Sequence, residues 1–258
     1  MTMPEVDGAP HVRVETRGSA RIITLAREAK RNALARQTVE EIAAALNDAA
    51  SDETIRGIVV AAEGDVFMAG GDLSEFAAFL EAPDAAERVI EMGQKLAVIE
   101  TLPVPVICAV AGDVYGGGCE FLLLADAVLA EPHATFSFRH VQMGLSPAWG
   151  GASRLLERVG PLAATRLLLT ADPVIAKEAR RVGLITDVVD HGTALDAACA
   201  MVERIARHDW AVVAENKRAL MAARSIQRAS LAQIEGDSFK SLWAGPAHRA
   251  AMSRGRKR

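Results

Sequence analysis

Residues 106–132 read "VICAVAGDVYGGGCEFLLLADAVLAEP", and this stretch contains the order of elements that decides the fold. A Val/Ile-rich run predicts a buried strand, three glycines follow in a turn, Phe121 to Leu124 continue a helix-like segment, and "DAVLAEP" predicts another strand. Such alternation is typical of an α/β protein. Glu120 interrupts the apolar pattern, and a buried carboxylate without partners is costly. That departure marks a candidate functional residue.

The alternation of strand and helix continues upstream of this stretch. The segments "HVRVETRG" and "ARIITLA" predict an N-terminal hairpin, and "IRGIVVAAEG" predicts a further strand. Apolar residues at three- and four-residue spacing predict one helix from Arg36 to about residue 51 and another over residues 85–100. The chain therefore begins with strands and then alternates.

Downstream of Pro161 the pattern is helical almost throughout, and "LITDVVD" (184–190) is the one strand-like run. We therefore expect two regions. Residues 1–192 would form an α/β core, and residues 193–258 would form a helical C-terminal region.

The composition favours one class of fold and argues against one class of binding partner. Half of the 258 residues are hydrophobic but only 4% are aromatic, which favours helices packed on a Val/Ile sheet over a β-sandwich. The net charge of −4 supplies no basic surface for nucleic acid, so we expect no nucleic-acid partner. The basic tail "SRGRKR" (253–258) is interpreted as a solvated terminus, with a grip on an anionic ligand or partner as the alternative.

The cysteines and the N-terminal segment indicate the compartment. Cys108, Cys119 and Cys199 lack the spacing of metal ligands, so we expect reduced core thiols and no metal site. The start, "MTMPEVDGAP", has neither a signal-peptide nor a transit-peptide pattern. No apolar run approaches the roughly 18 residues that a membrane span needs, so we expect a soluble, cytoplasmic protein.

Two glycine-rich turns follow two of the predicted strands. The turn in "VFMAGGDLSEF" (66–76) and the turn in "GDVYGGGCEF" (112–121) each run into a helix-like segment. Glycine allows close approach of backbone to a ligand, and a helix N-terminus presents unpaired N–H groups. Two such turns could direct two donors at one oxygen, as in an oxyanion hole. The alternative is a pair of ordinary strand-to-helix turns, and no phosphate-loop motif is present.

Four motifs in order are similar to those of the crotonase, or enoyl-CoA hydratase/isomerase, family. They are "KRNAL" (30–34), "FMAGGDL" (67–73), "GGGCE" (116–120) and "MGLSPAWGGASRL" (143–155). The resemblance covers about residues 11–190. It implies a spiral of repeated ββα units in residues 1–192 and a helical region in residues 193–258 that mediates oligomerisation, with assembly as trimers or dimers of trimers. It also implies an acyl-CoA thioester substrate and no separate cofactor, because coenzyme A is part of the substrate.

The resemblance assigns roles to particular residues. The two oxyanion donors would be the backbone N–H groups of Gly71, where the family more often has alanine, and Gly117. Trp149 would form a wall of the acyl pocket. The alternative is that Trp149 only packs in the core. Diphosphate contacts would come from Lys30 or Arg31. The full set of expected substrate-binding residues is Lys30, Arg31, Ala33, Ala69, Gly70, Asp72, Leu73 and Trp149.

Glu120 matches the first of the two glutamates that the family's hydratases use, and His140 stands where the second would be. A histidine can hold water and transfer protons near neutral pH, so hydration remains feasible. The alternatives are a structural ion pair for Glu120 and a structural histidine at position 140. His133, after Pro132, is predicted to lie in a loop.

We therefore expect an enoyl-CoA hydratase. The alternative is an alkylmalonyl-CoA decarboxylase, because "FRHVQMGLSPAWGG" (138–151) is similar to the segment FxHxxMGxxPxWGG of decarboxylases that act on ethylmalonyl- or methylmalonyl-CoA. An isomerase is less favoured, since family isomerases usually keep the carboxylate that His140 replaces. A non-catalytic scaffold or RNA-binding member is the remaining alternative.

Overall fold

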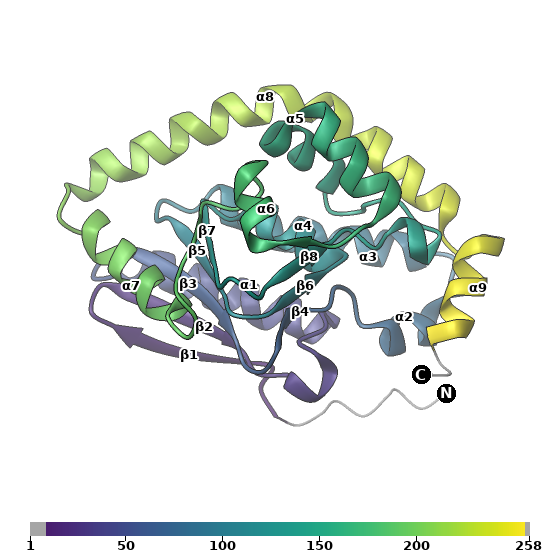
Figure 1. The fold of residues 1–258 in the computed structure, drawn as a ribbon, viewed down its shortest axis with the longest axis horizontal. Helices are drawn as coiled ribbons and strands as arrows, with labels where there is room; N and C mark the ends of the chain where they lie inside the picture. Colours follow the sequence, from purple (N-terminus) through teal and green to yellow (C-terminus); the bar gives the residue numbers. More distant parts are fainter. Residues whose placement is uncertain (1–8, 256–258) are drawn as a thin grey trace.

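The computed structural model describes residues 9–255, and Figure 1 shows their arrangement. Residues 1–8, with most of the N-terminal segment discussed above, lie outside the described residues. Residues 256–258 of the basic tail lie outside them as well. Two sheets occupy the centre of the molecule, and long helices cover them on the side where the C-terminal half of the chain lies (Figure 1).

Within the described residues, the larger sheet has six strands. Their order across the sheet is β1 (Val12–Arg17), β2 (Ala20–Leu25), β3 (Gly57–Ala62), β5 (Val106–Val110), β7 (Ala127–Ala130) and β10 (Asp187–Val188). The predicted hairpin is confirmed, because β1 and β2 pair antiparallel and Val12 lies opposite Leu25. The later neighbours pair in parallel. Strand β5 is buried along its whole length, as its continuous apolar sequence predicts.

A smaller second sheet contains β4 (Val66–Met68), β6 (Asp113–Tyr115), β8 (Thr135–Ser137) and β9 (Val174–Ile175). The sequence patterns did not predict these strands, because two or three residues are too few to show a period of two. Strands β4, β6 and β8 each follow a strand of the large sheet, and a helix comes next in the chain. Three successive ββα units result, which confirms the expected crotonase-like spiral.

The helices are α1 (Arg36–Ser51), α2 (Leu73–Phe79), α3 (Ala85–Leu96), α4 (Gly117–Leu124), α5 (Gly151–Thr170), α6 (Ala176–Arg181), α7 (Ala194–Ile205), α8 (Trp210–Leu242) and α9 (Pro246–Gly255). Single 3₁₀ turns form η1 (Glu28–Lys30), η2 (Ala97–Glu100) and η3 (Val141–Met143). The helix expected from Pro161 is the second half of α5, which bends at Gly160, where φ is 74°. The region after Pro161 also contains β9, which the helical pattern concealed.

Two apolar cores lie on opposite sides of the large sheet. The larger core packs the two sheets against α1, α3, α4 and α5, and it includes Phe121 and Phe136. The smaller core packs Ile22, Val59 and Ile107 against Val202 of α7. Helix α7 thus covers the second face of the sheet, although it lies beyond residue 192. The division into regions 1–192 and 193–258 stays a prediction.

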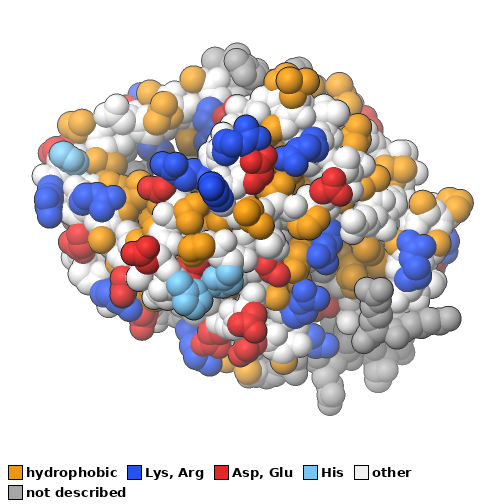
Figure 2. Space-filling view, viewed as in Figure 1, with side chains coloured by type: hydrophobic (Ala, Val, Ile, Leu, Met, Phe, Trp, Pro, Cys, Tyr) orange, Lys and Arg blue, Asp and Glu red, His pale blue; other side chains and the backbone are white. Residues whose placement is uncertain are grey.

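The cysteines lie in the core, as expected. Cys108, Cys119 and Cys199 are free and buried, and burial raises the pKa of the Cys108 thiol to about 12. The face in Figure 2 mixes basic and acidic side chains, and apolar ones appear along its upper edge, where Figure 1 places α8. None of the helices in residues 9–255 is long and apolar enough to cross a membrane.

Candidate active site

A cavity of about 360 Å³ brings the expected site residues together. It lies among the two glycine turns, the 3₁₀ turn η1, the loop before α5, and the C-terminal helices α8 and α9. The expected residues that line it are Lys30, Arg31, Ala33, Ala69, Gly70, Gly71, Asp72, Leu73, Gly117, Glu120, His140 and Trp149. Residues from positions 30 to 149 thus converge on one space.

The two glycine turns lie in contact with each other at this cavity. Gly70 has a φ of 91°, and a Cβ atom on it would lie 3.0 Å from the backbone nitrogen of Gly117. Leu34 donates its N–H to the Gly70 carbonyl (2.7 Å) and accepts the N–H of Asp72 (3.0 Å). In this parallel pairing the N–H of Gly71 points away from Leu34. No described residue accepts a backbone hydrogen bond from Gly71 or Gly117, so both donors are unpaired within the described chain.

Aromatic rings occupy the space beside both glycines. A Cβ atom on Gly71 would lie 2.3 Å from the ring of Phe76, and one on Gly117 would lie 2.6 Å from the ring of Trp149. Trp149 is held in place because its indole N–H donates to the carbonyl of Val89 at 2.7 Å. A side chain at either position would therefore force the neighbouring ring to move. The packing also places Trp149 as a wall of the cavity.

Glu120 is buried on α4, with 2% of its surface exposed. Its Oε2 accepts the backbone N–H groups of Trp149 (2.8 Å) and Gly151 (3.0 Å), and its Oε1 accepts that of Ala148 (3.4 Å). Gly151 is the first residue of α5, so the carboxylate lies where the helix dipole favours negative charge. These bonds compensate the burial of the charge. Gly151 must be glycine for this, because a Cβ atom would lie 2.5 Å from Oε2.

His140 lies in the turn between β8 and η3 and completes the contacts of Glu120. Its Nε2 is 2.9 Å from Oε1 of Glu120, and 11% of its side chain is exposed. A carboxylate only accepts hydrogen bonds, so Nε2 carries the proton. The lone pair of neutral His140 is then on Nδ1, which is buried and has no partner among the described residues. Glu120 and His140 form a hydrogen-bonded acid–base pair.

Asp72 lines the cavity, but its carboxylate is engaged elsewhere. It caps α2 by accepting the N–H groups of Ser74 (3.0 Å) and Glu75 (3.2 Å), and it pairs with Arg27 at 3.0 Å. This is the usual role of an aspartate at a helix N-cap. Its backbone N–H and carbonyl are also engaged, with Leu34 and with Phe76, so the expected substrate contact at position 72 stays a prediction.

Two more residues line the cavity, Tyr115 and Arg139, and neither had a predicted role. The guanidinium of Arg139 lies 3.6 Å from the centre of the Tyr115 ring, and that of Arg31 lies 5.3 Å from it. Tyr115 in turn donates a hydrogen bond to Asp113 at 2.5 Å. Partial burial opposes ionisation of Asp113, but bonds from Thr135 and Tyr115 hold its pKa below the usual value. The sequence signal for Tyr115 and Arg139 was their position beside predicted site residues.

The C-terminal helices supply two more lining residues, Phe239 of α8 and His248 of α9. His248 is 1% exposed and accepts the N–H of Ala244 at 3.1 Å, and burial lowers the pKa of His248. More than 80 residues of chain separate them from the last recognised motif, so no local pattern indicated them.

Comparison with known proteins gives the same class of fold and shows the family. A family model described as "Enoyl-CoA hydratase/isomerase" matches residues 15–255. The 2,3-dehydroadipyl-CoA hydratase of Escherichia coli K12 is 33% identical over 213 residues, which cover 82% of each chain. The ethylmalonyl-CoA decarboxylase of Gallus gallus is 30% identical over 205 residues, which cover 78% of this chain and 69% of that protein.

Solved structures agree as well. An enoyl-CoA hydratase/isomerase from Mycobacterium paratuberculosis superposes with a TM-score of 0.88 at 25% identity, covering 96% of this chain and all of that one. One from Xanthobacter autotrophicus Py2 has a TM-score of 0.86 at 27% identity, covering 96% and 93%. The molecule is thus an α/β spiral of the class that processes acyl-CoA thioesters. The chain belongs to the enoyl-CoA hydratase/isomerase, or crotonase, family.

Proposed function

We propose that this protein is an enoyl-CoA hydratase, which adds water to a 2-enoyl-CoA through a thioester enolate. One observation supports this most directly. The Glu120–His140 pair, joined at 2.9 Å, lines the same cavity as the unpaired amides of Gly71 and Gly117. Coenzyme A would arrive as part of the substrate, with Lys30 and Arg31 at the mouth for its phosphates. No further cofactor is proposed.

The two amides would act as the oxyanion hole. They donate hydrogen bonds to the thioester oxygen. These bonds stabilise the transition state because they strengthen as negative charge develops on that oxygen during attack at the β-carbon. Because the donors belong to a rigid backbone, they need little reorganisation during the reaction.

His140 would carry the proton. Its Nδ1 accepts a proton from the attacking water, and the same ring returns a proton to the α-carbon of the enolate. Since Nδ1 is shielded from solvent, the ring must shift before it meets the water. One group acting at one face implies syn addition of the hydroxyl group and hydrogen. Glu120 orients the ring and stabilises its protonated form.

Decarboxylation of an alkylmalonyl-CoA is the second candidate, and the saturation of Glu120 favours it. Three backbone amides and His140 already occupy its carboxylate, so Glu120 has little remaining capacity to bind water. In decarboxylation the bond between the α-carbon and the carboxylate breaks and CO₂ leaves. The electron pair forms the same enolate, which protonated His140 then protonates at the α-carbon. This route needs one proton donor and no bound water.

The two candidates are separated by parallel assays on crotonyl-CoA and ethylmalonyl-CoA. We expect loss of the enoyl absorbance with the first substrate and no CO₂ release from the second. Release of CO₂ without hydration would reverse the order of the two proposals. If longer and branched analogues of both substrates are also inert, both proposals are wrong.

We also propose that the protein assembles as a homotrimer or a dimer of trimers. Most of the exposed large apolar side chains lie on α5 and α8, including Leu162 and Leu169 on α5 and Leu220 and Ile234 on α8. Exposed apolar surface of this kind is typical of a protein–protein interface.

A further inference from the structure

Three side chains with metal-binding chemistry converge outside the lining of the candidate active site. Glu131 follows the last residue of β7, and His133 lies two residues further on. His191 is in the loop between β10 and α7. Parallel pairing of β7 with β10 brings the two segments together, although 58 residues separate His133 from His191 in the chain.

The potential ligand atoms surround one point. Oε2 of Glu131 is 3.0 Å from Nδ1 of His191 and 3.9 Å from Nδ1 of His133, and one potential ligand atom from each of the three residues lies within 4.8 Å of the other two. Two ligands of a tetrahedral zinc ion, each at about 2.0–2.1 Å from it, are roughly 3.4 Å apart. The observed separations lie on both sides of that value, so small side-chain shifts would suffice.

The hydrogen bond of His133 orients it as a metal ligand. Its Nε2 is 2.8 Å from the carbonyl oxygen of Ala111, and a carbonyl only accepts hydrogen bonds. Nε2 therefore carries the proton, and the lone pair of the neutral ring is on Nδ1, on the side of Glu131. Metal-binding histidines usually donate their other N–H to a carbonyl or carboxylate in this way.

Glu131 supplies a buried negative charge next to these rings. Its side chain is 3% exposed, and its Oε1 accepts the N–H of Ala194 at 3.3 Å, at the start of α7. Its Oε2 has only the two imidazoles as described partners. A lone pair on Nδ1 of His133 repels this oxygen unless a cation lies between them.

We propose that Glu131, His133 and His191 bind one divalent transition-metal ion, of which Zn²⁺ is the representative. The ligands would be Oε2 and the two Nδ1 atoms. Imidazole ligands favour Zn²⁺, Co²⁺, Ni²⁺ or Cu²⁺ over Mg²⁺ and Ca²⁺, which prefer oxygen. His191 is 81% exposed, so water can complete the coordination.

The ion would have a structural role. It would tie the loop before α7 to the end of β7, and α7 covers the second face of the large sheet. An ion that binds the folded chain but not the unfolded chain raises the free energy of unfolding. The alternative is a proton shared within the cluster, with His133 as an imidazolium ion.

The test uses the full chain after chelator treatment and titrates it with Zn²⁺, Co²⁺ and Mg²⁺. We expect saturable binding of one Zn²⁺ per chain by calorimetry, a visible absorption spectrum with Co²⁺, a higher melting temperature with Zn²⁺, and no binding of Mg²⁺. The variants His133→Ala and His191→Ala should lose Zn²⁺ binding. Glu131→Gln should lose Zn²⁺ binding as well, but Glu131 is buried and this variant can fail to fold. His191 is exposed, so His191→Ala should fold and still tests the site. Turnover of the CoA substrate should be unchanged in His191→Ala, which separates this site from the proposed reaction.

His208→Ala is the matched control, since His208 is an exposed histidine beyond the other end of the 12-residue helix α7. It should retain Zn²⁺ binding. The proposal is overturned if the wild type shows no saturable Zn²⁺ binding, or if His133→Ala and His191→Ala bind Zn²⁺ as the wild type does. Equal binding of Mg²⁺ would overturn it too.

Discussion

Glu120 keeps its charge in the core through backbone amides. Among the described residues no Lys or Arg forms an ion pair with it, and its one side-chain partner is His140. A structural ion pair is the alternative explanation for a buried glutamate at this position. The observed contacts instead place an anion at the N-terminus of α5 and beside a histidine in the cavity.

Replacing Glu120 with glutamine should lower kcat by about 100-fold or more, the usual size of an acid–base contribution. The neutral amide of glutamine cannot stabilise a protonated His140. Its NH₂ group also cannot accept the backbone N–H bonds that a carboxylate oxygen accepts. Affinity for a CoA thioester product should change little, because Gly71 and Gly117 bind through backbone. Steady-state kinetics on the confirmed substrate and equilibrium binding would measure both effects.

Glu235→Gln is the matched control for this variant. Glu235 is also buried and accepts an N–H of the first turn of α5, from Ser153 at 2.7 Å, but it does not line the cavity. Its replacement should leave kcat unchanged. Full activity in Glu120→Gln would remove Glu120 from the mechanism.

Gly71→Ala is expected to destabilise the protein by about 1–3 kcal/mol, the usual cost of overpacking a core. The new methyl group would meet the ring of Phe76 at 2.3 Å and displace the N–H donor, so KM or kcat should also worsen. Urea unfolding and substrate kinetics would measure the two losses.

The double variant Gly71→Ala/Phe76→Leu tests the cause of this loss. It should recover much of the stability relative to Gly71→Ala, since leucine removes the ring atoms that clash. Phe76→Leu alone controls for the loss of ring packing. Wild-type stability in Gly71→Ala would show that the turn relaxes freely.

At the scale of elements, α4 and α5 stabilise each other at both ends. Glu120 of α4 binds the N-terminus of α5, and Arg158 of α5 donates to the carbonyl oxygens of Leu122, Leu123 and Ala125 at the end of α4. Burial lowers the pKa of Arg158 to about 10, and the guanidinium remains charged at neutral pH. The pairing holds the catalytic candidate rigidly against its amide donors.

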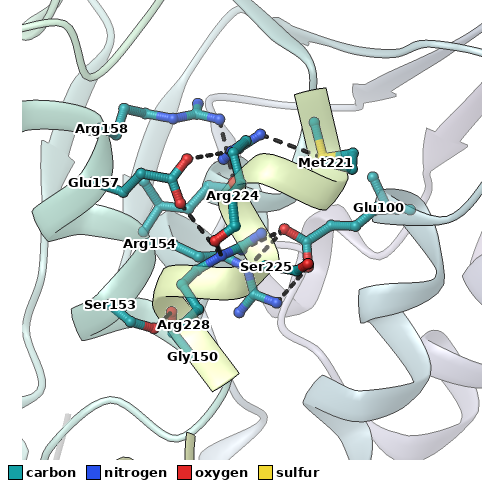
Figure 3. A network of polar contacts seen from close by, with 12 residues as sticks. Glu100, Gly150, Ser153, Arg154, Glu157, Arg158, Met221, Arg224, Ser225 and Arg228 are labelled. Atoms are coloured by element: carbon teal, nitrogen blue, oxygen red, sulfur yellow. Dashed lines mark hydrogen bonds and ion pairs between the residues drawn. The ribbon is translucent and has the colours of Figure 1, made fainter. Parts of the chain in front are cut away.

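A partly buried ionic network joins α5 to η2 and α8 (Figure 3). Glu100 of η2 binds Arg154 of α5 at 2.6 Å and Arg228 of α8 at 2.5 Å, and Arg228 also lies 3.3 Å from Glu157. Arg224 of α8 pairs with Glu157 as well. Each carboxylate thus faces two guanidinium groups, which links the long C-terminal helix to the helix that binds Glu120.

Glu100→Gln should lower the free energy of unfolding by about 3 kcal/mol at neutral pH, because it leaves two guanidinium groups without their carboxylate. Burial raises the pKa of Glu100, but Arg154 and Arg228 outweigh it and lower the pKa below the usual 4.5. The Glu100 carboxylate therefore makes its full contribution to the free energy of unfolding above pH 4.5. This contribution is lost as the pH falls through the lowered pKa of Glu100. Urea unfolding of both proteins across this range would measure it.

The difference between wild type and Glu100→Gln should thus be constant near neutral pH and shrink in acid. Glu215→Gln is the control, because Glu215 pairs with Arg218 on the exposed surface of α8. It should leave the free energy of unfolding unchanged. A difference that grows in acid would contradict the assigned direction of the pKa shift.

At the scale of the whole molecule, the apolar surface of α5 and α8 bears on assembly. Size-exclusion chromatography with light scattering should give the mass of three or six 27.4-kDa chains. The double variant Leu162→Asp/Leu220→Asp should give a smaller mass, because it places charges in the proposed interface. These leucines are 88% and 64% exposed in the single chain, so the variant should fold.

Val14→Asp controls for the addition of charge elsewhere, since Val14 is 45% exposed on the edge strand β1. It should keep the assembled mass. A wild type that runs as a monomer, or an unchanged mass in the double variant, would rule out this interface.

Much of the large sheet and most helices could be predicted because each has a local signal. Strand β5 is a continuous apolar run, and α1 buries Val39, Ile42 and Leu46 at helical spacing. The second sheet could not be predicted, since its strands are too short to show a period. The same holds for Phe239 and His248, which reach the cavity only through the path of α8 and α9.

The sequence by itself determined the α/β alternation, the two glycine turns and the choice of Glu120 as a candidate, because these features depend on residue type and on spacing over a few positions. His140 became a candidate through the resemblance to the crotonase family. Only the tertiary structure decided that the glutamate binds the start of α5, that Phe76 and Trp149 fill the space beside the glycines, and that Glu131 meets His133 and His191. Each of these contacts depends on how strands and helices pack, and packing joins atoms whose separation along the chain carries no local pattern.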